Sequence, residues 1–362
     1  MVYFLNLIAV PLYYLLIRLK TTDKKSAVAL FSIIVSIHAV VFRALANPYN
    51  YEEDTVLYAD AFRSIRDMSF FDTVFSIHSY THWGQLYLAL NWLLGLFSSN
   101  PAILFVVVSV ISVGLTIWFY KQTSYTILTS ILLYLMYPMM YIMGFGVLRQ
   151  HLSIAVVLLA LLFWDRLKLF VFFLICASLL HPSSLIIFPF LVLRKLDLQR
   201  FKLSVLIVYS VIAFIVLRVL ILLALPFFSK YQEIFNSGEA SNNIVPVMLI
   251  GSMILMYYVT GAVKRIDVER DMFFYSFLVY GLIVSVFSIG VPGAGRLSLV
   301  FIYMLPVAIS HIYKYGDSRM LNIIHLYTLG VFLLTIVLIV FQLKSADSSY
   351  NTYSFFWNVP IV

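Results

Sequence analysis

The sequence has 362 residues, of which 63% are hydrophobic and only 11% are charged. Charged residues make up about a quarter of an ordinary soluble domain, so this composition excludes a soluble enzyme or binding module. The formal net charge of +8 would suit nucleic-acid binding in a soluble protein. In a membrane protein, lysine and arginine instead set the orientation from cytoplasmic loops. We therefore expect membrane lipid, and no nucleic acid, around this chain.

Apolar runs recur along the whole chain at the length that spans a bilayer as a helix. The sequence therefore predicts an all-α, polytopic transmembrane protein of about 11 to 13 helical segments, including short, broken or re-entrant ones. An amphipathic helix is expected in an external loop. In chain order, the apolar segments cover residues 2–17, 27–46, 84–98, 101–119, 124–143, 151–164, 167–180, 183–193, 203–225, 246–262, 272–290, 297–313 and 320–343.

Basic connections between these segments predict the orientation of the chain. We place them in the cytoplasm, which makes the N-terminus external and leaves one segment that does not cross fully. Residues 86–97 are the candidate, because that run is short. We expect one integral membrane domain over 1–362, with a second external loop at 226–246. The basic connections are Arg18–Lys25, Asp165–Lys168, Arg194–Lys202, Lys264–Asp271 and Lys314–Arg319.

The loop over residues 47–85 differs from the rest because it is acidic. From Thr55 to Asp67, apolar residues recur at helical spacing, which predicts an amphipathic helix on the outer membrane face. The apolar residues of this expected helix are Val56, Ala59, Phe62, Ile65 and Met68.

Two polar interruptions are the most informative features of the apolar runs. Arg149-Gln150-His151 interrupts one run, and His181-Pro182-Ser183-Ser184 interrupts the next, at an expected bend near Pro182. An ionisable group at membrane depth costs a few kcal/mol, roughly, and usually marks a cavity or a site. For His181 two interpretations remain open: a general base with a suitable pKa, or a hydrogen-bonded anchor of the bend.

Arg149, Arg218 and Arg296 come from three segments and share the same expected depth near the outer leaflet. A guanidinium binds phosphate oxygens through a fork of donors and stays protonated, so the three suit a diphosphate. Snorkelling at a helix end is the alternative for Arg149.

Asp54 follows Glu52-Glu53 at the start of the acidic loop. This acidic group is part of a solvated turn, or it provides a general base or oxygen ligands for a divalent cation. Tyr58 belongs to a set of aromatic residues that fits an interfacial belt or a sugar site. The chain has no spacing of His and Cys typical of a metal site and no nucleotide-binding motif. We expect no metal and no cofactor.

Taken in order, these motifs resemble the EpsG family of Wzy-type polysaccharide polymerases, and the resemblance covers most of the chain. The residues that carry it are Asp54 with Tyr58, Leu148–Ala155, Ala177–Ser184, Gly295–Ser298 and Tyr353–Trp357.

The resemblance implies a multi-pass enzyme of the bacterial inner membrane, with its active site facing the periplasm or cell exterior. Such enzymes take undecaprenyl-diphosphate-linked oligosaccharides and transfer the growing glycan onto the next lipid-linked repeat unit of O-antigen, capsule or exopolysaccharide. A chain-length regulator as partner is also implied. For such a polymerase, we expect Arg149, Gln150, Arg218, Arg296 and Tyr58 to bind the substrate, with His181 or Asp54 as the base.

Two other functions remain open at this point. A membrane glycosyltransferase that adds one sugar from a lipid-monophosphate donor would also place an acidic loop after an early helix. A flippase of lipid-linked oligosaccharides would carry charges in both halves of the membrane, whereas the unusual charges here gather on the expected outer side.

Overall fold

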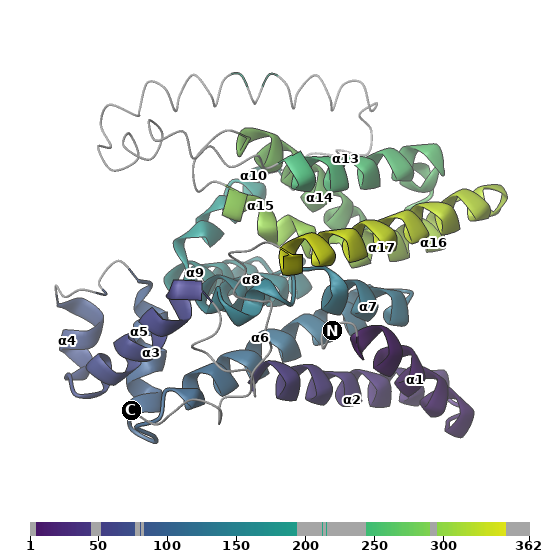
Figure 1. Ribbon diagram of the computed structural model, residues 1–362. Coiled ribbons are helices and arrows are strands. Elements are labelled where there is room, and N and C mark those ends of the chain that lie inside the picture. Colours follow the sequence, from purple (N-terminus) through teal and green to yellow (C-terminus); the bar gives the residue numbers. More distant parts are fainter. Residues whose placement is uncertain are drawn as a thin grey trace. The chain divides into compact units, whose positions relative to one another are not determined.

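The computed structural model describes residues 5–44, 52–76, 80, 83–193, 212, 215, 244–289 and 295–344. Every regular element within these residues is helical, which confirms the expected all-α fold (Figure 1). The chain divides into two compact units, Met1–Leu185 with Gly330–Val362, and Ile186–Leu329. The expectation of one membrane domain stays a prediction. Of the expected loop 226–246, residues 226–243 lie outside the described residues, and α13 begins at Ile244.

Among the described residues, five stretches are long and apolar enough to cross a bilayer. At a rise of about 1.5 Å per residue, a helix of about 20 residues spans the hydrocarbon layer. The chain is therefore a multi-pass membrane protein. The five are α2 (Lys24–Ala44), α6 (Ala102–Thr123), α14 (Glu269–Phe287), Gly295–Tyr315, which contains α15 (Gly295–Ile302) and α16 (Leu305–Tyr315), and Ser318–Phe341, which contains η8 (Ser318–Met320) and most of α17 (Leu321–Lys344).

The remaining helices are shorter. Two expected segments are broken: the run 124–143 contains a ten-residue helix followed by turns, and 297–313 is interrupted after Ile302. The segment 203–225 lies outside the described residues apart from two isolated positions. The shorter helices are α1 (Leu5–Lys20), α5 (Gln85–Gly95), α7 (Ile127–Met136), η3 (Met143–Phe145), α8 (Leu148–Leu162), α9 (Leu167–Leu180), α10 (Phe190–Leu193), α13 (Ile244–Val259) and η7 (Ala262–Lys264).

The expected bend after the second interruption is present. Helix α9 ends at Leu180, His181 adopts an extended backbone, and η4 (Pro182–Ile187) follows. Helices α8 and α9 pack together. The Ser153 hydroxyl of α8 donates to the Ala177 carbonyl (2.7 Å) and bonds the Ser184 hydroxyl (2.5 Å). These bonds hold the chain after the bend against the start of α8.

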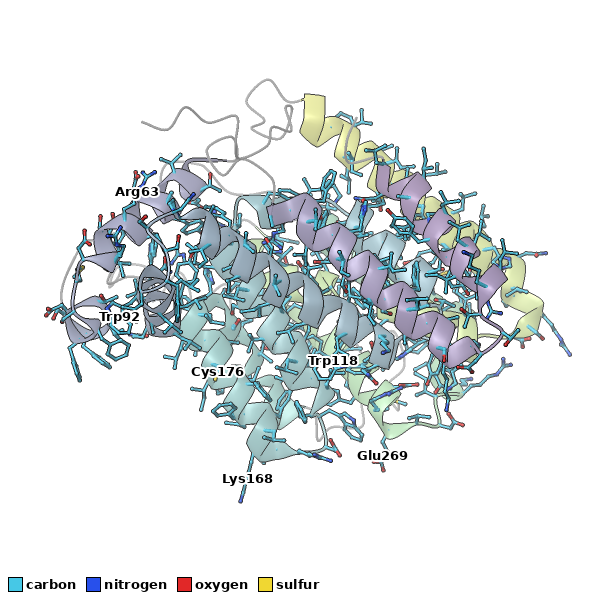
Figure 2. All side chains as sticks on the ribbon, turned by 90° about the horizontal axis from the view of Figure 1, so that it is seen from below. Arg63, Trp92, Trp118, Lys168, Cys176 and Glu269 are labelled. Carbon is cyan, nitrogen blue, oxygen red and sulfur yellow. The ribbon has the colours of Figure 1, made fainter. Side chains whose placement is uncertain are left out.

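The acidic loop forms a helix, α3 (Glu52–Arg66), followed by the short helix α4 (Phe70–Phe75). The expected apolar face is mostly right, because Ala59, Phe62 and Ile65 are buried. That face packs against α5 in the same core cluster instead of lying open to lipid. Val56 was placed on it wrongly, since its side chain is exposed. Arg63 projects from the outer side of α3 (Figure 2).

Helix α5 has only 11 residues and begins directly after Gly84. Its length corresponds to a rise of about 16 Å, which is roughly half of the hydrocarbon thickness. The short segment expected at residues 86–97 is therefore present as a short, partly buried helix. Whether it re-enters the membrane stays a prediction.

The second unit is built around α14, which packs against α10, α13, α15 and α16. Aromatic rings fill this core, with Phe277 and Tyr280 of α14 against Phe190 and Phe301. The Tyr280 hydroxyl donates to the Ile186 carbonyl (2.5 Å), which ties the segment after the bend to α14.

Candidate functional site

The first interruption is the first turn of α8. The helix begins at Leu148, so Arg149, Gln150 and His151 leave it in different directions. Gln150 and His151 are 1% and 2% exposed, whereas Arg149 is half-buried. Of the three, Arg149 alone keeps part of its side chain accessible, and Gln150 is placed inside the protein.

Arg149 is held by aromatic rings from two other segments. Its guanidinium carbon lies 4.5 Å from the ring centroid of Trp83 and 5.6 Å from that of Tyr58. The rings of Tyr58, Trp83 and Tyr87 pack edge to face at 5.3 to 5.9 Å, and Tyr80 packs on Trp83 at 5.1 Å. We call Tyr58, Trp83 and Tyr87 the aromatic support. Such cation–π contacts stabilise a guanidinium by about 0.5 to 2 kcal/mol, depending on solvation.

The charge of Arg149 has no anionic partner within the described residues. Its Nε atom is buried and makes no hydrogen bond, and no carboxylate forms an ion pair with it there. A buried donor without a partner is costly, by about 1 to 3 kcal/mol. A buried cation that faces π systems instead of carboxylates is suited to bind an anion from outside the protein.

The start of α5, next to the aromatic support, touches the end of α9, next to His181. A Cβ atom on Gly84 would lie 2.1 Å from the Leu179 carbonyl oxygen and 2.8 Å from that of Leu180. Only glycine permits this approach of the start of α5 to the end of α9. Trp83 and His181 are the neighbours of these touching residues, so the contact brings the two sequence motifs together.

His181 is oriented by the residue two positions later. Its Nδ1 atom accepts a hydrogen bond from the backbone N–H of Ser183 (3.3 Å) and lies 2.7 Å from the Ser183 hydroxyl. A backbone N–H can only donate, so Nδ1 is the acceptor and neutral His181 carries its proton on Nε2. The ring therefore offers an N–H donor from its other nitrogen.

Asp54 lies one helical turn before Tyr58, which places both on the same side of α3. Its side chain is half-buried and forms no hydrogen bond or ion pair with the described residues. Among the described residues, the Asp54 carboxylate is therefore not engaged, and it lies on the side of α3 that carries Tyr58. The side chains of Glu52 and Glu53 lie outside the described residues.

Arg43 of α2 forms a buried polar contact on the other side of α8. It is 4% exposed, its Nη1 donates to the Ser112 hydroxyl (3.1 Å), and its Nη2 donates to the Gly144 carbonyl. Two nitrogens of the Arg43 guanidinium thus bond to protein groups, and the bond to Gly144 ties α2 to the turn before α8.

The two other predicted arginines lie outside the first unit or outside the described residues. Arg218 and the aromatic tail at 353–357 lie outside the described residues. Arg296 is exposed in the first turn of α15 and belongs to the second unit. The shared depth of the three arginines stays a prediction, whereas Arg149, Tyr58, Asp54 and His181 all belong to the first unit.

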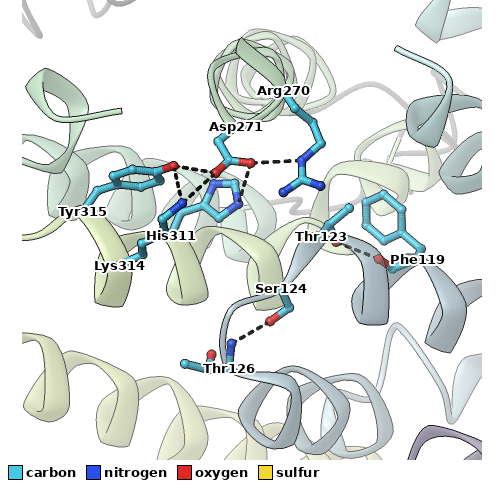
Figure 3. A network of polar contacts seen from close by, with 9 residues as sticks. All are labelled: Phe119, Thr123, Ser124, Thr126, Arg270, Asp271, His311, Lys314 and Tyr315. Carbon is cyan, nitrogen blue, oxygen red and sulfur yellow. Dashed lines mark hydrogen bonds and ion pairs between the residues drawn. The ribbon is translucent and has the colours of Figure 1, made fainter. Parts of the chain in front are cut away.

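A second charged cluster lies in the second unit and was not expected from the sequence. The Asp271 side chain is 0% exposed, although Asp271 closes a stretch that was assigned to a basic loop. Its carboxylate accepts from the Tyr315 hydroxyl (2.7 Å) and from Nε of Arg270 (3.2 Å), with His311 Nε2 at 3.7 Å (Figure 3). Lys314 donates to the Tyr315 hydroxyl (2.8 Å). The cluster joins the start of α14 to the end of α16.

Two further residues would have been difficult to select from the sequence. Trp83 is one of many aromatic residues near the expected outer face, and its contact with Arg149 joins positions 66 residues apart, which no local pattern indicates. Asp271 ends the basic stretch Lys264–Asp271, and its basic residues indicate a cytoplasmic loop instead of a buried carboxylate. Across the described part of the chain, no group of three His, Cys, Asp or Glu residues could hold a metal ion.

Comparison with known proteins gives one result. The family model described as "EpsG family" matches residues 28–355, which cover most of the chain and include both interruptions and the aromatic support. No curated protein and no solved structure matches the chain. The family match supports a membrane protein of the polysaccharide-polymerase type. This chain belongs to the EpsG family.

Proposed function

We propose that this protein polymerises lipid-linked oligosaccharides at the outer leaflet of the bacterial inner membrane. It transfers the growing glycan from undecaprenyl diphosphate onto the next lipid-linked repeat unit. The observation that carries the proposal is Arg149, a half-buried cation that is supported by Trp83 and Tyr58 and has no carboxylate partner among the described residues. The family match supports the same class of reaction.

The transfer requires a stabilised leaving group. The bond between the anomeric carbon of the growing chain and the diphosphate oxygen breaks, while the acceptor hydroxyl forms a new bond to that carbon. Negative charge then develops on the departing diphosphate. Arg149 supplies a fixed positive charge and N–H donors for it, which is electrostatic preorganisation. Arg218 and Arg296 are proposed as further diphosphate ligands.

The acceptor hydroxyl must also lose a proton. Asp54 is the better base, because its carboxylate is not engaged by other described residues and lies on the side of α3 that carries Tyr58. His181 uses its Nδ1 lone pair for Ser183, so it is better suited to donate from Nε2 to a phosphate or sugar oxygen. We assign His181 to positioning and Asp54 to proton removal.

The first test is charge reversal of Arg149. We expect Arg149→Glu to leave single repeat units on the surface glycan, while the protein stays in the membrane at its normal amount. Arg149→Lys should retain part of the activity, because an ammonium keeps the charge but loses the planar fork. Arg63→Gln is the matched control, since Arg63 is an exposed arginine that pairs with Asp60 on α3 (3.2 Å).

Gel analysis of the surface glycan separates the alternatives. A long polymer of normal length in Arg149→Glu cells would overturn the proposed role of Arg149. A long polymer that lacks one sugar after loss of the whole protein would instead identify a side-branch glycosyltransferase. Repeat units trapped on the cytoplasmic leaflet would identify a flippase.

A further inference from the structure

A basic cavity lies at one end of the packed pair α2 and α6, away from the groups used above. Its volume is about 670 Å³. Lys24 and Lys25 line it from the first turn of α2, and Lys121 and Gln122 line it from the last turn of α6. Residues nearly 100 positions apart thus place three ammonium groups on one cavity.

These lysines have no acidic partner among the described residues. All three are exposed, and no ion pair involves any of them there. The nearest acid in sequence, Asp23, is already used, because its carboxylate accepts the backbone N–H groups of Ser26 (2.7 Å) and Lys25 (3.3 Å). Hydrogen bonds from Ser26, followed by that from Lys25, hold the pKa of Asp23 below its usual value. The carboxylate therefore stays with the helix end.

Three like charges around one cavity repel one another unless an anion enters. The cap formed by Asp23 also occupies the backbone N–H groups of Lys25 and Ser26 at the start of α2. An anion bound here is therefore recognised mainly by lysine side chains. An ammonium is a compact point charge and binds phosphate without needing a fixed geometry.

The surroundings of the cavity indicate where the phosphate comes from. Val28 and Ala29 form its apolar part. Along α6, the partly exposed residues Trp118, Gly114 and Val110 follow Gln122 at spacings of four residues, so they share one face of the helix. Trp118 is 41% exposed and Val110 50% exposed (Figure 2 labels Trp118). At Gly114 no atom lies within 4 Å of a Cβ position.

We propose that this cavity binds the phosphate headgroup of an anionic phospholipid, with an acyl chain along the α6 face of Trp118, Gly114 and Val110. Basic pockets between transmembrane helices recognise lipid headgroups in this way, and tryptophan is enriched at the depth of headgroups. A free phosphate would use the lysines alone and leave the apolar face without a role. The site does not depend on the proposed polymerase activity.

Native mass spectrometry of the full-length protein in mild detergent tests the proposal. We expect phosphatidylglycerol to bind in preference to phosphatidylcholine with the same acyl chains. The variant K24Q/K25Q/K121Q should bind phosphatidylglycerol at least roughly tenfold more weakly than the wild type, because each basic group near the headgroup contributes to binding. Equal binding of phosphatidylglycerol by this variant and the wild type would overturn the proposal.

Matched variants keep the test decisive if the first one folds poorly. K168Q/K264Q/R319Q removes the same charge from exposed positions elsewhere and should bind phosphatidylglycerol like the wild type. A loss of binding in this control would show that net charge, and not the cavity, attracts the lipid.

A charge-preserving variant and a competitor complete the test. K24R/K25R/K121R should retain binding, and its failure to bind while folded would contradict recognition by charge. Inorganic phosphate added to the wild type should not displace phosphatidylglycerol at equal concentration. Displacement would assign the cavity to a free anion and overturn the lipid as its ligand.

Discussion

Replacing Trp83 by leucine should reduce polymer synthesis without removing the protein from the membrane. The Arg149 guanidinium lies 4.5 Å from the Trp83 ring, closer than the 5.6 Å to Tyr58, so Trp83 provides the stronger of the two contacts. A contact of this kind at a half-buried site contributes about 1 to 1.4 kcal/mol. If Arg149 must be in place at the transition state, this corresponds to a decrease in rate of about five- to tenfold.

Polymer formed per molecule of protein in isolated membranes is the appropriate measurement, because leucine also leaves space beside Tyr58 and Tyr87. Trp83→Phe should fall between leucine and the wild type, since phenylalanine keeps a smaller π face. Trp92→Leu is the control: Trp92 packs on Phe70 at 5.1 Å and donates to the Met68 carbonyl (3.1 Å), without touching Arg149.

We expect Trp92→Leu to lower the amount of folded protein while leaving synthesis per molecule unchanged. The reasoning about Arg149 would be refuted by Trp83→Leu membranes that match wild-type synthesis per molecule. It would also be refuted if the two leucine variants lost the same amount, because the effect would then reflect packing alone.

Three further substitutions test other parts of the structure. Gly144→Ala should destabilise the protein by about 1 to 3 kcal/mol, because the alanine Cβ would lie 2.9 to 3.1 Å from the Arg43 guanidinium. A lower unfolding temperature in detergent would show this loss of stability. Asp271→Asn should lower the unfolding temperature more strongly, since breaking a buried charge cluster costs about 3 kcal/mol or more. Ser183→Ala should reduce synthesis about fivefold, because His181 loses its hydrogen bond with the Ser183 hydroxyl, a net contribution of about 1 kcal/mol.

Each of these has a control of the same chemistry. Gly330→Ala places a Cβ where no atom lies within 4 Å and should be neutral or slightly stabilising. Asp60→Asn removes an exposed carboxylate whose surface ion pair contributes little. Ser178→Ala removes a hydroxyl that bonds only within α9 and should leave synthesis unchanged. A control that behaves like its partner would show that the named contact is not the cause.

The periodicity and length of apolar runs were sufficient to predict much of the fold. Helix α9 was predicted with its observed ends, and the bend at Pro182 follows from the missing N–H of proline. The break after Ile302 was missed, because its residues are as apolar as those of a continuous helix. The face of α3 was predicted, but its neighbour was expected to be lipid, because hydrophobicity alone does not distinguish lipid from another helix.

The site was predictable in part for the same reason. Arg149 and His181 stand out because each interrupts an apolar run. Trp83 does not stand out, since an aromatic residue near a membrane surface has an ordinary explanation. Its role depends on Gly84 touching the end of α9, a contact between distant segments that no local pattern records.

The choice of π systems as partners for Arg149 has a consequence for repeated turnover. Aromatic rings contact the flat faces of a guanidinium, whereas oxyanions bind in its plane through the N–H edge. Neighbours of these two kinds do not compete for the same side of the group. An anion can thus arrive and depart many times without displacing a carboxylate of the described residues. In a cycle of repeated transfers, release of the anionic product from Arg149 then requires no exchange between an ion pair with the product and an ion pair with a carboxylate.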